Sequence, residues 1–272
     1  MEVFQALVLG IVQGLTEWLP LSSSGHLALA QLYMGEGTVA YDVVLHVATL
    51  AVVIVYFRKD VVAIVGDWAR GISEATRPGN RKAALFGKKA RLWGWLILLA
   101  SIPTAIIGFL LDRYLGGGDF TSLAFLGAGF IVTGIFLATT YFAKPKERQM
   151  GAPEAATVGA AQGLSVFSSL SRSGLTVGAA ALMGVSREDA GKFSFLAMIP
   201  AVIGAAALKI FDIGALARAD LLPMAVGALA AALVGFLCLK AMMFIAKRNG
   251  MWWFAPYCVG LGVALLAWPF IV

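Results

Sequence analysis

Charged residues are scarce in this sequence. Of its 272 residues, 13% are Asp, Glu, Lys or Arg, whereas 60% are hydrophobic and the mean hydropathy is +0.86. Soluble domains carry about 25% charged residues, so this composition excludes an ordinary soluble enzyme. Several apolar runs reach the roughly 20 residues that a helix needs to cross a bilayer. Residues 1–272 are therefore predicted to form a single membrane domain, all-α and polytopic.

Cysteine is scarce as well. Cys238 and Cys258 both lie inside apolar runs, at a spacing that fits neither a CxxC motif nor a zinc site. We expect them to be small packing residues. The 21 Lys and Arg exceed the 15 Asp and Glu, which gives a net charge of +6. In a membrane protein such an excess is typical of cytoplasmic loops and of attraction to anionic lipid, so no nucleic-acid partner is predicted.

Six apolar runs are long enough to be complete transmembrane helices. They cover residues 40–57, 92–112, 122–143, 190–210, 221–246 and 252–271. Two further apolar segments, residues 2–34 and 153–185, are interrupted by serine-rich stretches that leave neither half long enough to span. Non-helical backbone at membrane depth is tolerated only where it is buried in protein or lines a watery cavity. Each segment is therefore predicted to be a re-entrant helical hairpin.

Basic residues predict the orientation of the spans. Residues 58–91 carry nine Lys and Arg against three Asp and Glu, which indicates a basic, solvated, cytoplasmic loop without catalytic chemistry. When the spans are threaded alternately through the membrane, Lys144 and the Lys247-Arg248 pair lie on the same side as residues 58–91. Both termini then lie outside. The first hairpin then enters from outside and the second from the cytoplasm.

An internal repeat agrees with this opposite entry. A shift of 149 residues aligns a series of identical residues between the two hairpins. The aligned residues are Gly10, Gln13, Gly14, Leu15, Leu21, Ser22, Ser24 and Gly25 with Gly159, Gln162, Gly163, Leu164, Leu170, Ser171, Ser173 and Gly174. Each half, residues 1–143 and 153–272, then holds one hairpin and three spans. The predicted fold is an inverted-topology 3+3 repeat, a plan shared by many transporters.

Polar groups gather at the two interruptions. Gln13 and Glu17 are four residues apart on a helix and share a face. Residues 22–24, three serines, follow directly and can cap the next half-helix, whose N–H groups and dipole suit an anion. In the second interruption, residues 171–174 add the guanidinium of Arg172, whose fork matches phosphate oxygens. If the two turns meet near the midplane, they form a phosphate site.

Ionisable residues deep in a membrane segment are costly unless they are paired or hydrated. Glu17 and Arg172 are therefore predicted to be functional, the alternative being a structural ion pair. His26 follows the first turn and is suited to proton transfer. We expect His46 to be a hydrogen-bonded structural residue. Any single serine is more often an interhelical hydrogen-bonding group than a catalytic one.

At these residues the sequence resembles the undecaprenyl-diphosphate phosphatase family of the bacitracin-resistance type. Residues 13–17, QGLTE, match the family signature (Glu/Gln)-x-x-x-Glu, and the likeness continues to residue 26. Residues 171–174, SRSG, match the end of the motif Pro-Gly-x-Ser-Arg-Ser-Gly. The resemblance extends over nearly the whole chain. Two long motifs in register are far more specific than either alone.

The resemblance implies hydrolysis of a C55 polyprenyl diphosphate to the monophosphate and inorganic phosphate, which recycles the lipid carrier for cell-wall synthesis and confers bacitracin resistance. It also implies a divalent cation, Mg²⁺ or Ca²⁺, and an active site that opens to the outside of the inner membrane. By position, Glu17 and Gln13 hold the metal or orient water, Ser22 or Ser23 lies beside the scissile phosphate, His26 transfers a proton, and Arg172 binds the diphosphate. The remaining substrate-binding residues are Ser24, Gly25, Ser171, Ser173, Gly174 and Thr176.

Two departures from the family pattern stand out. Ser168 and Ser169 replace Pro-Gly, which changes the backbone angles that the turn prefers, and His46 stands where many members have Gln.

Three questions stay open. The nucleophile is either a turn serine with His26 as base, or a water that Glu17 and His26 orient. The same cavity suits a polyprenyl-phosphate transporter. The exposed apolar faces suit either lipid or a homodimer.

Overall fold

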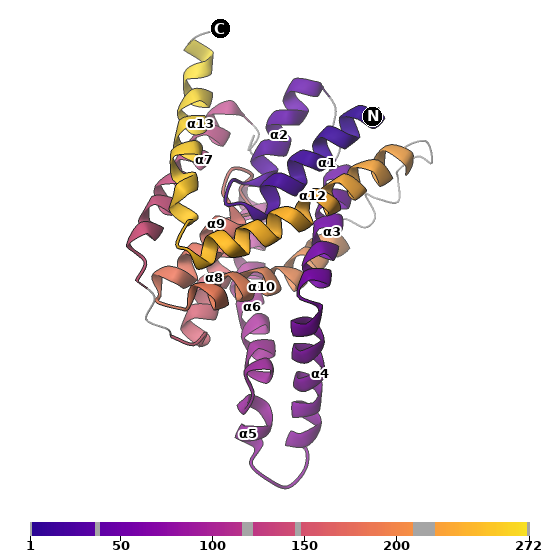
Figure 1. Ribbon diagram of the computed structural model, residues 1–272, viewed down its shortest axis with the longest axis vertical. Helices are drawn as coiled ribbons and strands as arrows, with labels where there is room; N and C mark the ends of the chain where they lie inside the picture. The colour runs from indigo at the N-terminus through magenta and orange to yellow at the C-terminus, as the bar shows by residue number, and fades with distance from the viewer. Residues whose placement is uncertain (1, 36–38, 116–121, 145–147, 209–220, 271–272) are drawn as a thin grey trace.

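The computed structural model describes residues 2–35, 39–115, 122–144, 148–208 and 221–270 (Figure 1). Within these residues every regular element is a helix, apart from one isolated β-bridge between Arg148 and Val185. In Figure 1 the start of α1 and the end of α13 lie toward the end of the molecule opposite to the protruding helices α4 and α5. The predicted all-α class is confirmed.

Six long helical stretches correspond to the predicted spans. They are α3 (Val39–Tyr56), α6 (Lys89–Leu115), α7 (Leu123–Thr139) continued by η1 (Thr140–Phe142), α10 (Arg187–Leu208), α12 (Leu221–Lys247), and α13 (Ala255–Ala267) flanked by η3 (Met251–Phe254) and η4 (Trp268–Phe270). Within the described residues five helices are long and apolar enough to cross a membrane, or six if the bent pair α3 and α4 counts as one span. Residues 209–210 and 271 of the predicted spans lie outside the described residues. The chain is a multi-pass membrane protein.

Residues 58–91, predicted as a basic solvated loop, are largely helical. Helix α4 (Arg58–Ala75) continues α3 after a bend of 79°, and α5 (Arg81–Phe86) follows before α6 begins. The reason is an apolar stripe on α4, which includes Val61, Ile64 and Trp68 and faces α6 and α10. A stripe at helical spacing buries itself best on a neighbouring helix. The cytoplasmic location of this segment stays a prediction.

Each of the two serine-rich stretches separates two short helices. Helix α1 (Val3–Trp18) ends before Leu19-Pro20, and α2 (Ser23–Met34) begins after Ser22. Helix α8 (Ala152–Leu164) and α9 (Arg172–Leu182) flank the second stretch. A residue before proline disfavours helical angles, and a serine at an N-cap accepts a hydrogen bond from the new helix. The first break thus follows directly from local sequence.

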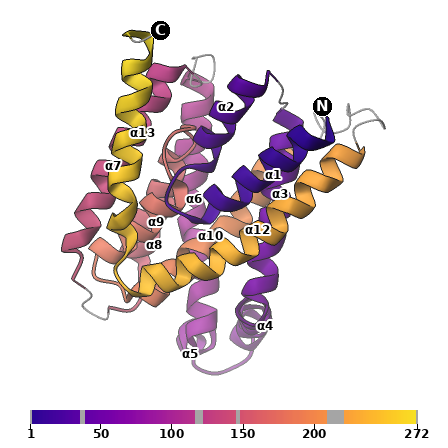
Figure 2. The same ribbon diagram turned by 45° about the horizontal axis from the view of Figure 1, so that its top comes forward.

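Small residues let the short helices approach the long ones closely. Gly14 of α1 lies so near α12 that a Cβ atom there would come within 2.8 Å of the carbonyl oxygen of Ala231. Gly163 of α8 lies against α6 in the same manner, where a Cβ atom would come within 2.7 Å of Ile107 Cβ. Such small-xxx-small packing is typical of membrane helices. In Figure 2, α1 and α12 run side by side.

The larger core cluster draws buried side chains from α1, α3, α6, α7–α10, α12 and α13. Its large buried side chains include Trp18, Trp93, Phe193 and Met198. Trp18, the last residue of α1, packs edge-on against Phe195 of α10, with ring centroids 5.5 Å apart. The outer faces of the long helices instead expose large apolar side chains, as lipid-facing surfaces do. The core thus anchors the end of α1, where the first polar turn begins.

Candidate active site

The structure brings the two serine-rich turns together. Ser22 Oγ and Ser24 Oγ both donate to the carbonyl oxygen of Ser168, at 2.5 and 2.7 Å. In the other direction, Ser173 Oγ donates to the carbonyl oxygen of Leu19 at 3.1 Å. These bonds join segments that are 144 to 154 residues apart in the chain. The polar groups of both turns therefore share one site.

Glu17 lies at the centre of this site. Its side chain is buried, with 3% of the residue exposed. The carboxylate oxygen Oε2 accepts hydrogen bonds from Gln13 Nε2 at 3.1 Å and from Ser23 Oγ at 2.5 Å, while Oε1 pairs with Arg172 Nη2. A buried charge that lost such partners would cost several kcal/mol. Glu17 thus receives hydrogen bonds or ion pairs from α1 and from both turns.

Arg172 is the first residue of α9 and points from the second turn to the first. Nη2 pairs with Glu17, and Nη1 is buried without a hydrogen-bond partner among the described residues. A buried guanidinium N–H without an acceptor is unfavourable. The Nη1 nitrogen of the guanidinium is therefore available to donate to an anion at the site.

The three serines of the first turn have different surroundings. Ser22 has a positive φ of 67°, a strained conformation for a residue with a side chain, and its Oγ caps α2 by accepting from the Gly25 N–H. Ser24 donates only to the backbone of the second turn. Ser23 alone of the three donates to a carboxylate, that of Glu17. Of the two serines predicted beside the scissile phosphate, Ser23 is therefore the one placed for deprotonation.

Gly25 is required by close packing. A Cβ atom at this position would come within 2.8 Å of Phe130 Cζ on α7 and 3.0 Å of the Ser168 carbonyl oxygen. The glycine therefore permits the contact between the turns and leaves its N–H to the Ser22 cap.

His26 is held in one tautomer by its two neighbours. Nδ1 lies 2.8 Å from the carbonyl oxygen of Ser22, which can only accept, so Nδ1 carries the proton. Nε2 then accepts from the hydroxyl of Tyr257, also at 2.8 Å. The Tyr257 ring stacks on the imidazole with centroids 5.8 Å apart. Sequence reasoning missed Tyr257; its only signal was a hydroxyl-bearing side chain within an apolar run.

The second turn is shaped mainly by hydroxyls that bind backbone. Ser171 Oγ caps α9 by accepting from the Gly174 N–H, and Thr176 Oγ1 donates to the Arg172 carbonyl oxygen. Thr133 of α7, which the sequence analysis missed, donates to the Ser169 carbonyl oxygen and accepts from the Ser171 N–H. These contacts orient Arg172. The four residues Ser171, Ser173, Gly174 and Thr176, predicted to bind substrate, are all buried around it.

The replacement of Pro-Gly by Ser168 and Ser169 leaves the junction between the turns intact. Ser168 contributes its carbonyl oxygen to Ser22 and Ser24, and Ser169 contributes its carbonyl oxygen to Thr133. Every amino acid supplies a carbonyl oxygen. The departure from the family motif is therefore compatible with these contacts.

His46 lies closer to the site than the sequence suggested. Its Nδ1 is 2.7 Å from the carbonyl oxygen of Asp42 on its own helix, which agrees with a hydrogen-bonded histidine. Its Nε2, however, faces Glu17 Oε2 at 3.8 Å. The imidazole thus borders the carboxylate at the centre of the site.

Ligands for a cation are few but present. Among the described residues no group of three His, Cys, Asp or Glu side chains lies together. The buried amide oxygen of Gln13, however, has no hydrogen-bond partner in the described chain, and it belongs to the amide that contacts Glu17. Mg²⁺ is commonly held by one or two protein ligands together with substrate phosphates and water. The residues present fit a cation of that kind.

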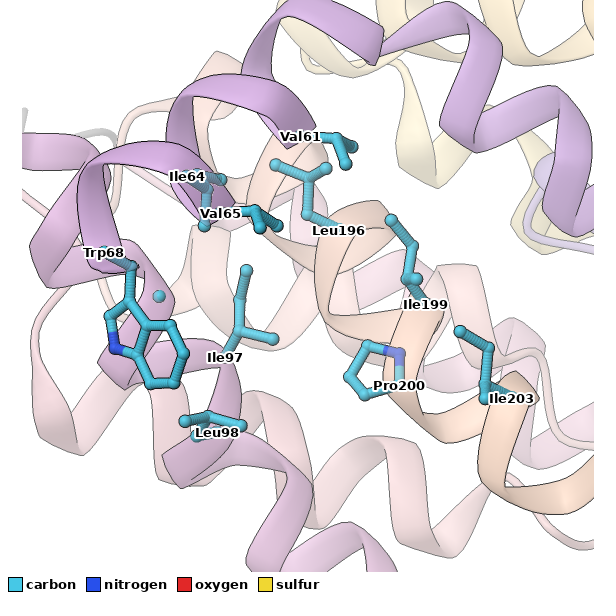
Figure 3. Close-up of a pocket in the computed structure, with 11 residues that line it drawn as sticks. Val61, Ile64, Val65, Trp68, Ile97, Leu98, Leu196, Ile199, Pro200 and Ile203 are labelled. Carbon is cyan, nitrogen blue, oxygen red and sulfur yellow. The ribbon is translucent and has the colours of Figure 1, made fainter. Parts of the chain in front are cut away.

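An apolar cavity lies elsewhere in the protein. Figure 3 shows it between α4, α6 and α10, with a volume of about 250 Å³. Its lining includes Val61, Trp68, Ile97, Leu196 and Ile203, and none of the predicted site residues. A cavity without polar side chains cannot stabilise a phosphate. The candidate active site is therefore the junction of the two turns.

Comparison with known proteins shows the family to which this chain belongs. Residues 6–264 match the family described as bacitracin resistance protein BacA. The undecaprenyl-diphosphatase of Korarchaeum cryptofilum is 38% identical over 269 residues, which cover 98% of this chain and 99% of that protein. The undecaprenyl-diphosphatase of Desulfosudis oleivorans is 40% identical over 276 residues, covering 96% and 97%. That of Carboxydothermus hydrogenoformans is 38% identical over 280 residues, covering 98% and 97%. The chain belongs to the bacitracin resistance protein BacA family.

Proposed function

We propose that this protein is a membrane phosphatase that hydrolyses undecaprenyl diphosphate to the monophosphate and inorganic phosphate. One observation carries the proposal: the buried Glu17 carboxylate contacts both the Ser23 hydroxyl and the Arg172 guanidinium. A nucleophile, its base and an anion-binding group thus occupy one cluster, as phosphoryl transfer requires. The names of the relatives support the choice of substrate. Release of the monophosphate would recycle the lipid carrier and underlie resistance to bacitracin.

Ser23 is the proposed nucleophile. Its Oγ attacks the terminal phosphorus while its proton passes to Glu17 Oε2, which already accepts its hydrogen bond. The bond between phosphorus and the bridging oxygen breaks, and the lipid monophosphate leaves. Water then attacks the phosphoseryl phosphorus, the bond from phosphorus to Ser23 Oγ breaks, and Glu17 returns its proton to Oγ, which restores the hydroxyl and releases inorganic phosphate. The Glu17 contact favours Ser23 over Ser22, whose hydroxyl caps α2, and it makes Glu17 the base in place of His26.

Arg172 and His26 act on the two ends of the diphosphate. Arg172 keeps its ion pair with Glu17 through Nη2, while Nη1, which has no partner in the described chain, donates to a phosphate oxygen. The N–H groups at the start of α2 and α9 add partial positive charge at the same place. His26 supplies a proton to the departing monophosphate when its Nε2 carries one, and Tyr257 positions that nitrogen. The substrate contacts predicted for Ser24, Gly25, Ser171, Ser173, Gly174 and Thr176 remain part of the proposal.

A divalent cation, Mg²⁺ or Ca²⁺, is proposed beside Glu17 and Gln13. The fit is supported by the Glu17 carboxylate and by the buried Gln13 amide oxygen that lacks a partner in the described chain. When bound, such a cation neutralises charge on the phosphate oxygens. Glu17 and Gln13 would hold it, and Arg172 would share the neutralisation from the opposite side.

The proposed architecture is an inverted-topology 3+3 repeat, residues 1–143 and 153–272, with α1–α2 and α8–α9 as re-entrant hairpins. Its strongest support is an exchange of hydrogen bonds: Ser24 donates to the Ser168 carbonyl, and Ser173 donates to the Leu19 carbonyl. Ser24 and Ser173 are 149 positions apart, and so are Leu19 and Ser168. This is the shift that aligns the two repeats. The packing of α1 on α12 and of α8 on α6 follows the same relationship.

We further propose that the protein lies in the cell membrane with both termini outside and residues 58–91 in the cytoplasm. The placement of α1 and α13 opposite α4 and α5 supports this orientation (Figure 1). The active site would then open to the outer side. A homodimer stays a prediction from the exposed apolar faces.

The test is phosphate release from undecaprenyl diphosphate by detergent-purified protein, with and without Mg²⁺ or Ca²⁺. Wild type should release phosphate, and Ser23→Ala, Glu17→Gln and Arg172→Ala should not. Thr157→Ala is the matched control, because its exposed hydroxyl binds only the Pro153 carbonyl within α8. A folded wild type that carries polyprenyl phosphate across vesicles without releasing phosphate would favour the transporter and overturn the phosphatase.

A further inference from the structure

Among the described residues, His46 Nε2 is a histidine nitrogen that faces a carboxylate, that of Glu17, and makes no hydrogen bond. The chain has two histidines, both within the described residues. His26 uses both ring nitrogens, toward Ser22 and Tyr257. His46 uses only Nδ1, which must carry the proton because its partner is the Asp42 carbonyl oxygen. With the Nδ1 proton on this bond, Nε2 is the ring nitrogen that faces Glu17 and is open to a ligand bond.

The distance between the two atoms is informative. Nε2 lies 3.8 Å from Glu17 Oε2, which is too far for a hydrogen bond. Two lone-pair atoms that face each other repel unless a positive charge lies between them. Metal–ligand bonds of about 2.1 Å from each atom can bridge such a gap.

Two further observations point to a cation at this position. The Gln13 amide, 0% exposed, contacts Glu17 Oε2 through Nε2, and its oxygen is buried without a partner in the described chain. The His46 ring is also oriented as metal-ligating histidines are, with the second nitrogen donating to a backbone carbonyl. Asp42, whose carbonyl receives that bond, is itself fixed by Gln31 Nε2 at 2.6 Å from Oδ1. The surroundings thus hold the imidazole ready to bind.

We propose that His46 Nε2 is a third protein ligand, with Glu17 and Gln13, of the divalent cation in the active site. The inference rests on the proposed function, because it concerns the cation proposed there. An imidazole nitrogen strengthens binding of Mn²⁺ and the later transition metals more than binding of Mg²⁺ or Ca²⁺, which prefer oxygen. The site therefore accepts Mg²⁺ but binds Mn²⁺ more tightly.

The experiment is a titration of detergent-purified, tag-free protein with MnCl₂, followed by pulsed electron paramagnetic resonance of bound Mn²⁺. A coordinated imidazole gives a ¹⁴N coupling that oxygen ligands do not. Wild type and His26→Gln should show this coupling, and His46→Gln should lose it. His46→Gln should weaken Mn²⁺ binding about tenfold or more, whereas Mg²⁺ affinity, measured by competition, should fall less than about threefold.

The design stays decisive if His46→Gln fails to fold. Wild type and His26→Gln are then grown with ¹⁵N-histidine, and the change from ¹⁴N to ¹⁵N coupling in His26→Gln assigns the signal to His46. No Mn²⁺ binding, no nitrogen coupling in wild type, or a coupling that disappears in His26→Gln would each overturn the proposal. Phosphate release from undecaprenyl diphosphate is measured with Mg²⁺ on the same wild-type sample. Phosphate release without a nitrogen coupling would refute His46 as a metal ligand and leave the phosphatase proposal standing. A nitrogen coupling without phosphate release would refute the phosphatase proposal and leave the ligand assignment standing.

Discussion

Arg172 and Glu17 form an ion pair across the two turns, with the Glu17 carboxylate buried, although they are 155 residues apart in the sequence. The pair joins the start of α9 to the end of α1. It has a mechanical consequence, because loss of either partner leaves an uncompensated charge inside the membrane domain. It has a chemical consequence too, because it aligns the Glu17 carboxylate with Ser23.

Arg172→Ala should lower both stability and activity. The unpaired Glu17 carboxylate is expected to cost about 3–5 kcal/mol of unfolding free energy. Thermal unfolding in detergent micelles measures this cost. The double variant Glu17→Gln/Arg172→Met, which removes both charges, should recover most of the stability but none of the phosphatase activity. Equal stability of wild type and Arg172→Ala would show that the pair is not buried as described.

Ser23→Ala and Ser22→Gly should separate catalysis from turn structure. Ser23→Ala removes the hydroxyl bonded to Glu17 and is expected to reduce kcat at least about 10³-fold without loss of folding. Ser22→Gly loses the side-chain cap of α2, which costs only about a few tenths of a kcal/mol when glycine is the replacement, and it relieves the positive φ of 67°. It should therefore retain most activity.

Trapping of labelled phosphate on the protein distinguishes these serines directly. Label on Ser23 in wild type, and its absence in Ser23→Ala, is the expected result. Label on Ser22 would contradict the assignment, and product formation without any labelled protein in a single turnover would favour an activated water.

Tyr257→Phe should lower kcat about tenfold and leave KM within about twofold. The variant keeps the ring that stacks on His26 at 5.8 Å and removes only the hydroxyl that donates to Nε2. Steady-state kinetics with undecaprenyl diphosphate checks this split. Tyr141→Phe is the control, because Tyr141 lies on η1 and its ring packs on Trp252 away from the turns. A rise in KM at constant kcat would instead place Tyr257 in substrate binding.

Gly14→Ala should destabilise the protein by about 1–3 kcal/mol. The added methyl would come within 2.8 Å of the Ala231 carbonyl oxygen and push α1 away from α12. Gly204→Ala on α10 is the matched control, because a methyl group there would meet no described atom within 4 Å beyond its own helix backbone, and alanine favours helix. Thermal unfolding of the two variants in one detergent compares them. Equal effects would mean that α1 does not approach α12 this closely.

Much of this protein was predictable from residues near one another in the chain. Length and hydropathy of the apolar runs indicated the long helices, and Leu19-Pro20 with the serines after it indicated the break between α1 and α2. These signals are local, because a helix, its end and its cap depend on neighbouring residues. The candidate residues Glu17 and Arg172 also stood out, because a charge within an apolar segment is costly.

The partners of those residues depended on the tertiary structure. Residues 58–91 are largely helical because the apolar stripe of α4 packs against α6, whereas their high charge alone suggested a loop. Tyr257 meets His26 across 231 residues, and His46 meets Glu17 from α3. Composition and periodicity carry no information on which side chains from distant helices converge. That choice is made by close helix packing, at positions such as Gly14 and Gly163, and it converts two serine-rich turns into one site.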